Sequence, residues 1–419
     1  MAILFQGKDL RLTYLSNNSD TTFVIFNHRN GKKHPIETSE FMSFAEGTAH
    51  KMGYNEFNIS TSRNHWYQTD EIIDVVRLIG DHNQLGAKII TYGSSMGAYA
   101  SINFAEMLNA HRFLAFSPQY SLHPDLRPHE DTRWQLESEL LEFTYDYIHA
   151  GAIQDRRGYL FYDKESPDNQ HAKLILNKTS AIGFHIPLSR HGAALVLNQS
   201  YGLKTLLKEV AEESFDPAKF SRAFEEKFAQ SLRYILSNHK ENGNLTKLKN
   251  FVISKDISPK ELRYLLTSSI RNDDIQIKKL ALLAYSFSPV KLDNIGGFRA
   301  LKIEILIQLN LQREAMIEIL NSTTPSKEQA ERLMSSYRNL SELAIVLPLL
   351  TKLEPASFRK SAEKCAKQHL GRSLVLMKYA LSLRPNNPYM KKKVVEYERL
   401  ANDTSTAPKV AEDSTEGNA

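Results

Sequence analysis

The segment Gly93-Ser94-Ser95-Met96-Gly97 has the spacing that presents a serine hydroxyl as a nucleophile. It follows an apolar stretch, residues 88–92, and precedes a second one, residues 98–108. In this G-x-S-x-G pattern the flanking glycines let the neighbouring backbone pass at a sharp strand-to-helix turn without a Cβ clash. The hydroxyl then stands at a helix N-terminus, which favours developing negative charge. The pattern therefore predicts Ser95 as a catalytic nucleophile.

A serine nucleophile needs a general base, and two histidines lie near the last predicted strand, residues 181–186. His191 follows that strand in Ser189-Arg190-His191-Gly192, where a loop can return an imidazole to the serine. His185 lies inside the strand, where a packing role is more natural. We therefore favour His191 over His185 as the base.

The histidine in turn needs a carboxylate to fix its tautomer, and in this chain order the acid comes between serine and histidine. Asp163 directly follows the predicted strand 159–162, whereas Asp168 stands where a helix N-cap belongs. We favour Asp163 and keep Asp168 as the alternative.

Two further groups of residues would complete such a site. The backbone amide of Met96, together with that of Asn27 or His28 after an early strand, is expected to hold the oxyanion. Trp66 and Tyr67 are expected either to form an aromatic platform for a sugar ring or to anchor the following helix in the core. We expect neither a metal nor a cofactor.

Gly93 to Gly97, Asp163 and His191, in that order, resemble the α/β-hydrolase superfamily over residues 1–212. The segments HWYQTDEI, YGSSMGAYASINFA, AFSPQYS, FYDKESPDNQHA and SRHG resemble, more narrowly, the bacterial α/β hydrolases found beside capsular and exopolysaccharide genes. That resemblance implies a substrate carrying an acyl group on a polysaccharide. The chain departs from many lipases and esterases in having FNHRNG where they carry a His-Gly-Gly run.

The elements that must position these residues follow from hydrophobic patterning. Apolar strands alternate with helical stretches, which predicts a mostly parallel sheet with helices on both faces. The predicted strands are residues 22–26, 56–60, 87–92, 113–116, 159–162 and 181–186. Residues 121–157 interrupt this alternation and are expected to form a cap, in which Trp134 packs.

Helical patterning without strands predicts an all-α domain over residues 213–400. Two helices are expected within residues 355–399, whose closing ALSLRPNNP resembles a tetratricopeptide repeat. Residues 401–419 hold no aromatic side chain and are expected to be disordered.

The composition excludes several classes of protein. The chain has 419 residues, with 53 basic and 48 acidic side chains, a balance that does not indicate a nucleic-acid-binding protein. It has one cysteine and no apolar run near the roughly 20 residues that cross a bilayer. We expect a cytoplasmic protein with no secretory signal and no membrane insertion.

Together these features predict a serine hydrolase that cleaves a carboxylic ester through an acyl-enzyme. Two alternatives remain. An O-acyltransferase would use the same residues on a glycan acceptor, and a catalytically silent scaffold would bind a protein partner through the helical domain.

Overall fold

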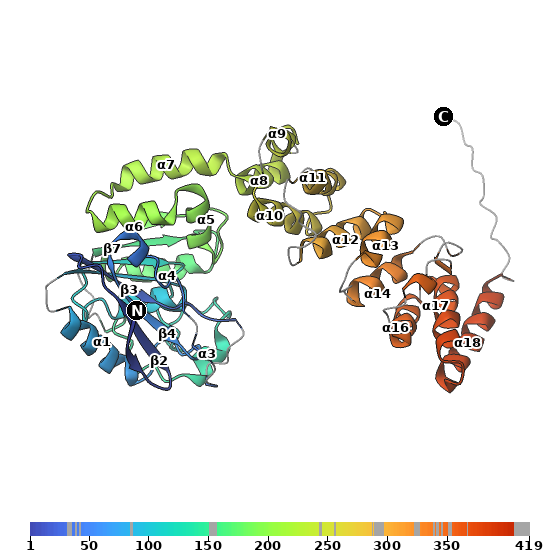
Figure 1. Cartoon of the computed structure of the whole chain (residues 1–419), viewed down its shortest axis with the longest axis horizontal. Helices are drawn as coiled ribbons and strands as arrows, with labels where there is room; N and C mark the ends of the chain where they lie inside the picture. Colours follow the sequence, from blue (N-terminus) through green and yellow to red (C-terminus); the bar gives the residue numbers. More distant parts are fainter. Residues whose placement is uncertain are drawn as a thin grey trace, which may run out of the picture. The chain divides into compact units, whose positions relative to one another are not determined.

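The structure is a computed structural model, and the chain divides into two compact units, Met1–Ser237 and Asn238–Ala419 (Figure 1). It describes residues 1–405 except 32–35, 38–39, 42, 84–86, 151–156, 243–244, 255–256, 287, 289–296, 322–326, 338–339, 341–342, 345–346, 351–353 and 367. Each unit has its own hydrophobic core.

One eight-stranded sheet forms the centre of the first unit, in the order β1-β2-β4-β3-β5-β6-β7-β8. Strands β1 and β2 form an antiparallel edge, and β4 and the strands that follow it in this order pair in parallel. This arrangement confirms the predicted fold class. The strands are β1 (Ala2–Gln6), β2 (Leu10–Leu15), β3 (Thr21–Phe26), β4 (Asn55–Thr61), β5 (Lys88–Ser94), β6 (Arg112–Phe116), β7 (Arg157–Tyr162) and β8 (Ser180–His185).

Helices cover both faces of the sheet, which is why the central strands are apolar on both sides. Along β3, Val24 and Phe26 join one buried cluster, and Phe23 and Ile25 join the other. The first cluster contains side chains of α1 (Glu71–His82), α2 (Met96–Asn103) and α4 (Asp168–Leu176). The second contains side chains of α5 (Ala193–Ser200), α6 (Leu203–Ala211) and α7 (Pro217–Ala229), seen opposite α1 in Figure 1.

Helix α7 extends the first unit beyond the expected limit at residue 212. Its N-cap Asp216 accepts hydrogen bonds from the amides of Ala218 and Lys219. Its buried side chains Phe220, Phe224 and Phe228 join the core on the sheet face that α5 and α6 cover. The helix therefore belongs to the α/β unit.

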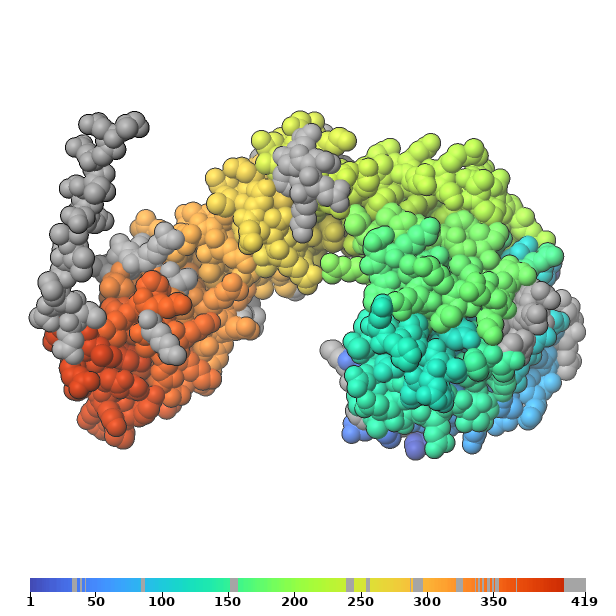
Figure 2. Space-filling model, turned by 180° about the vertical axis from the view of Figure 1, so that it is seen from behind, coloured from blue at the N-terminus to red at the C-terminus, as the bar shows by residue number. Residues whose placement is uncertain are grey.

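Residues 121–150, here called the covering segment, run between β6 and β7 and hold one short helix, α3 (Gln135–Leu140). The predicted cap is therefore mostly irregular, and its last residues, 151–156, lie outside the described residues. Figure 2 shows the first unit, coloured blue to green, as a continuous surface.

The second unit is helical throughout its described residues, as expected. Residues 355–399 hold three helices and not the expected two. The expected helices are α16 and α17, and the third, α18, follows the turn at residues 384–387. Helix lengths range from 9 residues in α9 to 18 in α18, and the tetratricopeptide resemblance stays a prediction. After α8 (Leu232–Asn242) come α9 (Thr246–Ser254), α10 (Pro259–Ile270), α11 (Ile275–Ser286), α12 (Phe298–Gln308), α13 (Gln312–Leu320), α14 (Lys327–Ser336), α16 (Pro355–Cys365), α17 (Leu370–Leu383) and α18 (Pro388–Ser405).

The C-terminal helix differs from the sequence-based expectation. Helix α18 continues to Ser405, past the expected start of a disordered tail at residue 401. Residues 406–419, the rest of that predicted tail, lie outside the described residues. In the part of the chain that is described, no helix is long and apolar enough to span a bilayer.

Candidate active site

Ser95 occupies the sharp turn between β5 and α2, with φ 54° and ψ −121°. The flanking glycines are required by close backbone contacts. A Cβ on Gly93 would lie 2.1 Å from the carbonyl oxygen of Gly97, and a Cβ on Gly97 would lie 2.3 Å from that of Phe26. The turn is thus built against β3, and it holds Ser95 at the carboxyl end of the sheet, where loops from neighbouring parallel strands meet.

His191 lies on the loop between β8 and α5 and contacts Ser95. Its Nε2 atom is 2.8 Å from the Ser95 Oγ atom. Its Nδ1 atom lies 2.9 Å from one carboxylate oxygen of Asp168 and 3.0 Å from the other. A carboxylate only accepts hydrogen bonds, so Nδ1 carries the proton and Nε2 is free to accept the serine proton. This is the arrangement that a general base requires.

The acid beside His191 is Asp168, and the pairing with Asp163 that the sequence favoured is not observed. Asp168 is the first residue of α4, is fully buried, and makes no side-chain cap of its own helix. The N-cap role that argued against it is therefore absent, because Pro167 occupies that position. Its carboxylate is turned toward His191 instead.

Asp163 is buried nearby and holds the loop that carries His191. One of its carboxylate oxygens accepts a 2.7 Å hydrogen bond from the backbone amide of Arg190, and the other accepts one of 3.1 Å from that of Glu165. The competing histidine, His185, accepts a 3.1 Å hydrogen bond from the amide of Lys164. Ser95 Oγ is hydrogen-bonded to His191, and these hydrogen bonds of Asp163 and His185 go to backbone amides instead.

Asp168 is kept ionised by its neighbours. Burial opposes ionisation of this carboxyl, but the hydrogen bond from His191 and the charge of Arg133 outweigh it and hold the pKa of Asp168 below its ordinary value. Arg133, in the covering segment, donates through Nη2 to Asp168 over 2.7 Å. The site thus presents a carboxylate, and not a carboxylic acid, to His191 near neutral pH.

The predicted aromatic platform is not exposed, because Trp66 and Tyr67 are both fully buried. The Tyr67 hydroxyl donates to the carbonyl oxygen of Asn27 over 3.0 Å, and the ring packs edge-on against Phe26. The core-anchoring alternative therefore describes Tyr67. The aromatic ring beside the site is Trp134, whose centroid is 5.4 Å from that of His191 and 5.6 Å from that of Trp66.

Of the three backbone amides expected at an oxyanion hole, two make no hydrogen bond within the described residues. The amide of Asn27 donates to the carbonyl of Ile59 over 3.3 Å, which excludes it. The amides of Met96 and His28 donate to no group within the described part of the chain. Met96 is the first residue of α2. The pair Met96 and His28 therefore has the free donors that an oxyanion hole needs.

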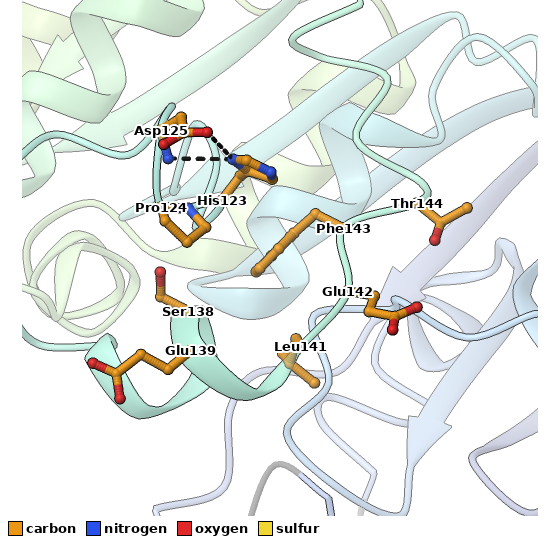
Figure 3. Close-up of a pocket in the computed structure, with 9 residues that line it drawn as sticks. All are labelled: His123, Pro124, Asp125, Ser138, Glu139, Leu141, Glu142, Phe143 and Thr144. Carbon is orange, nitrogen blue, oxygen red and sulfur yellow. Dashed lines mark hydrogen bonds and ion pairs between the residues drawn. The ribbon is translucent and has the colours of Figure 1, made fainter.

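One pocket of the first unit is separate from the serine. A pocket of about 510 Å³ opens in the covering segment between His123, Asp125, Glu139 and Phe143 (Figure 3), and neither Ser95, His191 nor Asp168 lines it. Among the described residues, no three His, Cys, Asp or Glu side chains are grouped so as to hold a metal ion.

Sequence patterning did not identify Arg133 as a site residue, and it placed Trp134 in the cap only. Both belong to the irregular covering segment, where periodicity carries no information on which side chain turns inward. The pattern that could have drawn attention to them is the adjacency of a cation and an indole in a segment expected to overlie the serine.

No protein-family model matches the sequence, and a comparison with curated proteins gives no match. Solved structures similar to this chain include α/β-hydrolase-type proteins. The capsule O-acetyltransferase of Neisseria meningitidis serogroup A is 11% identical, with a TM-score of 0.32 over 50% of this chain and 93% of that one. An alpha/beta superfamily hydrolase from Oenococcus oeni is 12% identical, with a TM-score of 0.33 over 51% and 99%. Acetyl xylan esterase 1 from a Thermoanaerobacterium species is 10% identical, with a TM-score of 0.35 over 49% and 80%.

Proposed function

We propose that the protein is a serine enzyme that cleaves a carboxylic ester through an acyl-enzyme. The observation that carries the proposal is the continuous contact from the Ser95 Oγ atom through His191 to Asp168, with distances of 2.8 Å and 2.9 Å. A serine hydroxyl is a weak nucleophile unless a base removes its proton, and this geometry supplies that base.

The proposed reaction assigns a group to each step. His191 takes the Ser95 proton through Nε2 as the oxygen attacks the ester carbonyl, and Asp168 stabilises the imidazolium. The amides of Met96 and His28 receive the negative charge on the carbonyl oxygen. The imidazolium then protonates the departing alkoxide, and water, activated by the same histidine, releases the acid and restores Ser95.

The substrate class we propose is an acyl ester on a polysaccharide, which rests on the sequence resemblance to hydrolases found beside capsular genes. The same serine ester serves an O-acyltransferase when a sugar hydroxyl replaces water as the acceptor. Assays with and without an added glycan acceptor separate the two activities by their products.

The decisive experiment compares the wild-type chain with Ser95→Ala. Hydrolysis of p-nitrophenyl acetate and labelling by a fluorophosphonate are both expected to disappear in the variant. Ser94→Ala, one residue earlier in the same turn, is the matched control and is expected to keep both. Activity or labelling that persists in Ser95→Ala rejects the proposal, and an inactive wild-type chain favours a scaffold that binds a partner.

A further inference from the structure

The acid Asp168 belongs to a chain of charged groups that continues beyond it, away from His191, through Arg133 and Asp131 to His171. Arg133 bridges two carboxylates: its Nη2 atom is 2.7 Å from Asp168 and 2.6 Å from Asp131, and its Nε atom is 2.8 Å from the other oxygen of Asp131. Asp131 and Asp168 are 2% and 0% exposed. An arginine fork that holds two carboxylates in this way fixes the orientation of both.

The far end of the chain is anchored by a histidine whose proton position is defined. His171 is fully buried and its Nδ1 atom accepts a 2.9 Å hydrogen bond from the amide of Tyr120. The proton of the neutral ring is therefore on Nε2, which lies 3.1 Å from Asp131 and donates to it. Although burial opposes its ionisation, Asp131 is held by Arg133 and His171 with its pKa below the ordinary value.

Arg133 also approaches the base itself. Its Nη1 atom lies 3.3 Å from the His191 Nδ1 atom. Both atoms carry protons, so the contact joins two donors and is unfavourable. Repulsion between two positive charges is added when His191 is protonated during the reaction. An arginine here would weaken the base if its charge were not balanced. Asp131 supplies that balance, since the sum of Asp131, Arg133 and Asp168 is −1 + 1 − 1 = −1.

The other charges around His191 are the same in the wild type and in every variant of the test described below. Arg29, which lies over the Trp134 ring, pairs with the buried Glu137 at 2.7 Å, so these two charges cancel. Arg190 precedes His191 in the loop and its side chain is exposed to solvent, which screens its charge. Asp163 faces the backbone amide of Arg190 and not the ring.

We propose that Arg133 is a positioning residue for Asp168, and that Asp131, fixed by His171, is the counter-ion that leaves one net negative charge facing His191. The role in catalysis rests on the proposed function, whereas the electrostatic arrangement does not. Removing the charge of Arg133 must therefore change the proton affinity of His191 in one direction, and removing the charge of Asp131 must change it in the other.

The test is an NMR titration of His191 in the full-length chain with ring-labelled histidine, assigned by its loss in His191→Gln. Arg133→Gln changes the local sum to −2 and is expected to raise the titration midpoint of His191 by about one pH unit. Asp131→Asn changes it to 0 and is expected to lower the midpoint by roughly half a unit, because Asp131 is farther away. The double variant restores −1 and is expected to titrate near the wild-type value.

Midpoints that do not move, or that move in the same direction in both single variants, overturn the proposal. If Asp131→Asn does not fold, Arg133→Lys decides: it keeps the charge and is expected to hold the midpoint within about 0.3 units while Arg133→Gln shifts it. The pH at which kcat/KM falls on the acidic side is expected to shift in the same direction as the His191 midpoint in each variant. Shifted midpoints in a chain without esterase activity would reject the proposed function and leave the charge arrangement standing.

Discussion

The carboxylate of Asp163 accepts a 2.7 Å hydrogen bond from the backbone amide of Arg190, the residue that precedes His191. Two aspartates five positions apart thus act on the same histidine by different routes. Asp168 contacts the imidazole, and Asp163 binds the backbone of the loop that carries His191. Exchanging each carboxylate for an amide separates the two roles.

Asp168→Asn is expected to lower kcat by about 10⁴, because an amide does not fix the tautomer or balance the imidazolium. Asp163→Asn retains an oxygen that accepts from the Arg190 amide, so its kcat is expected to fall by less than roughly tenfold. Steady-state kinetics with p-nitrophenyl acetate measure both. Equal losses in the two variants would contradict the assignment of the acid.

Gly97→Ala is expected to destabilise the first unit by roughly 3 kcal/mol, because the added methyl group would stand 2.3 Å from the carbonyl oxygen of Phe26. Gly80→Ala is the matched control. It lies in α1 with no atom within 4 Å of the added Cβ, and alanine there is expected to stabilise the helix by up to about 1 kcal/mol. The chain's two tryptophans both lie in the first unit, so their fluorescence during urea unfolding reports on that unit.

We expect His65 to make the first unit lose stability in acid. Burial lowers the pKa of His65 to about 4, below the roughly 6.5 of an unfolded histidine. Between these values the unfolded chain binds more protons than the folded one, so stability is complete above pH 6.5 and falls as the pH drops toward 4. The expected loss over this window is roughly 3 kcal/mol.

His65→Gln cannot titrate and is expected to flatten the dependence of the unfolding free energy on pH between 6.5 and 4. His82→Gln alters an exposed histidine in α1 and is expected to leave the slope as it is. The comparison concerns slopes, so a uniform loss of stability in His65→Gln does not affect it. An unchanged slope in His65→Gln would show that this ring is not the group responsible.

Tyr67→Phe is expected to cost about 1 kcal/mol, because it removes the donor to the buried carbonyl of Asn27 and leaves the ring packing intact. Tyr14→Phe, which keeps its ring stacked on Phe57 at 4.5 Å, is expected to change stability by less than about 0.5 kcal/mol. Thermal unfolding followed by tryptophan fluorescence compares the two. A Tyr67→Phe variant as stable as the wild type would contradict the stabilising role of this hydrogen bond.

The parallel sheet could be predicted from sequence because burial on both faces makes each strand a short apolar run between polar loops, as at residues 22–26. The serine and the histidine could be placed because each follows such a strand. The choice between Asp163 and Asp168 could not be made, since both follow β7 and only the path of the distant loop 186–192 decides which carboxylate meets the imidazole.

Long-range placement also explains the other differences from the sequence-based expectations. Trp66 and Tyr67 have the composition of a sugar platform, but packing against Phe26 and Trp134 buries them. Arg133 and Asp131 lie two positions apart in an irregular segment, and their partners Asp168 and His171 come from α4. A local sequence pattern does not predict such contacts between the covering segment and α4.

The backbone conformation of Ser95 carries a cost in stability at the residue on which the proposed function depends. With φ 54° and ψ −121° the backbone adopts a conformation that glycine enters freely and other residues enter at a cost of about 1–3 kcal/mol. Ser95→Gly is therefore expected to unfold at a higher temperature than the equally inactive Ser95→Ala. The strain is thus the cost of holding any side chain at this turn, and the Ser95 hydroxyl cannot be kept without it.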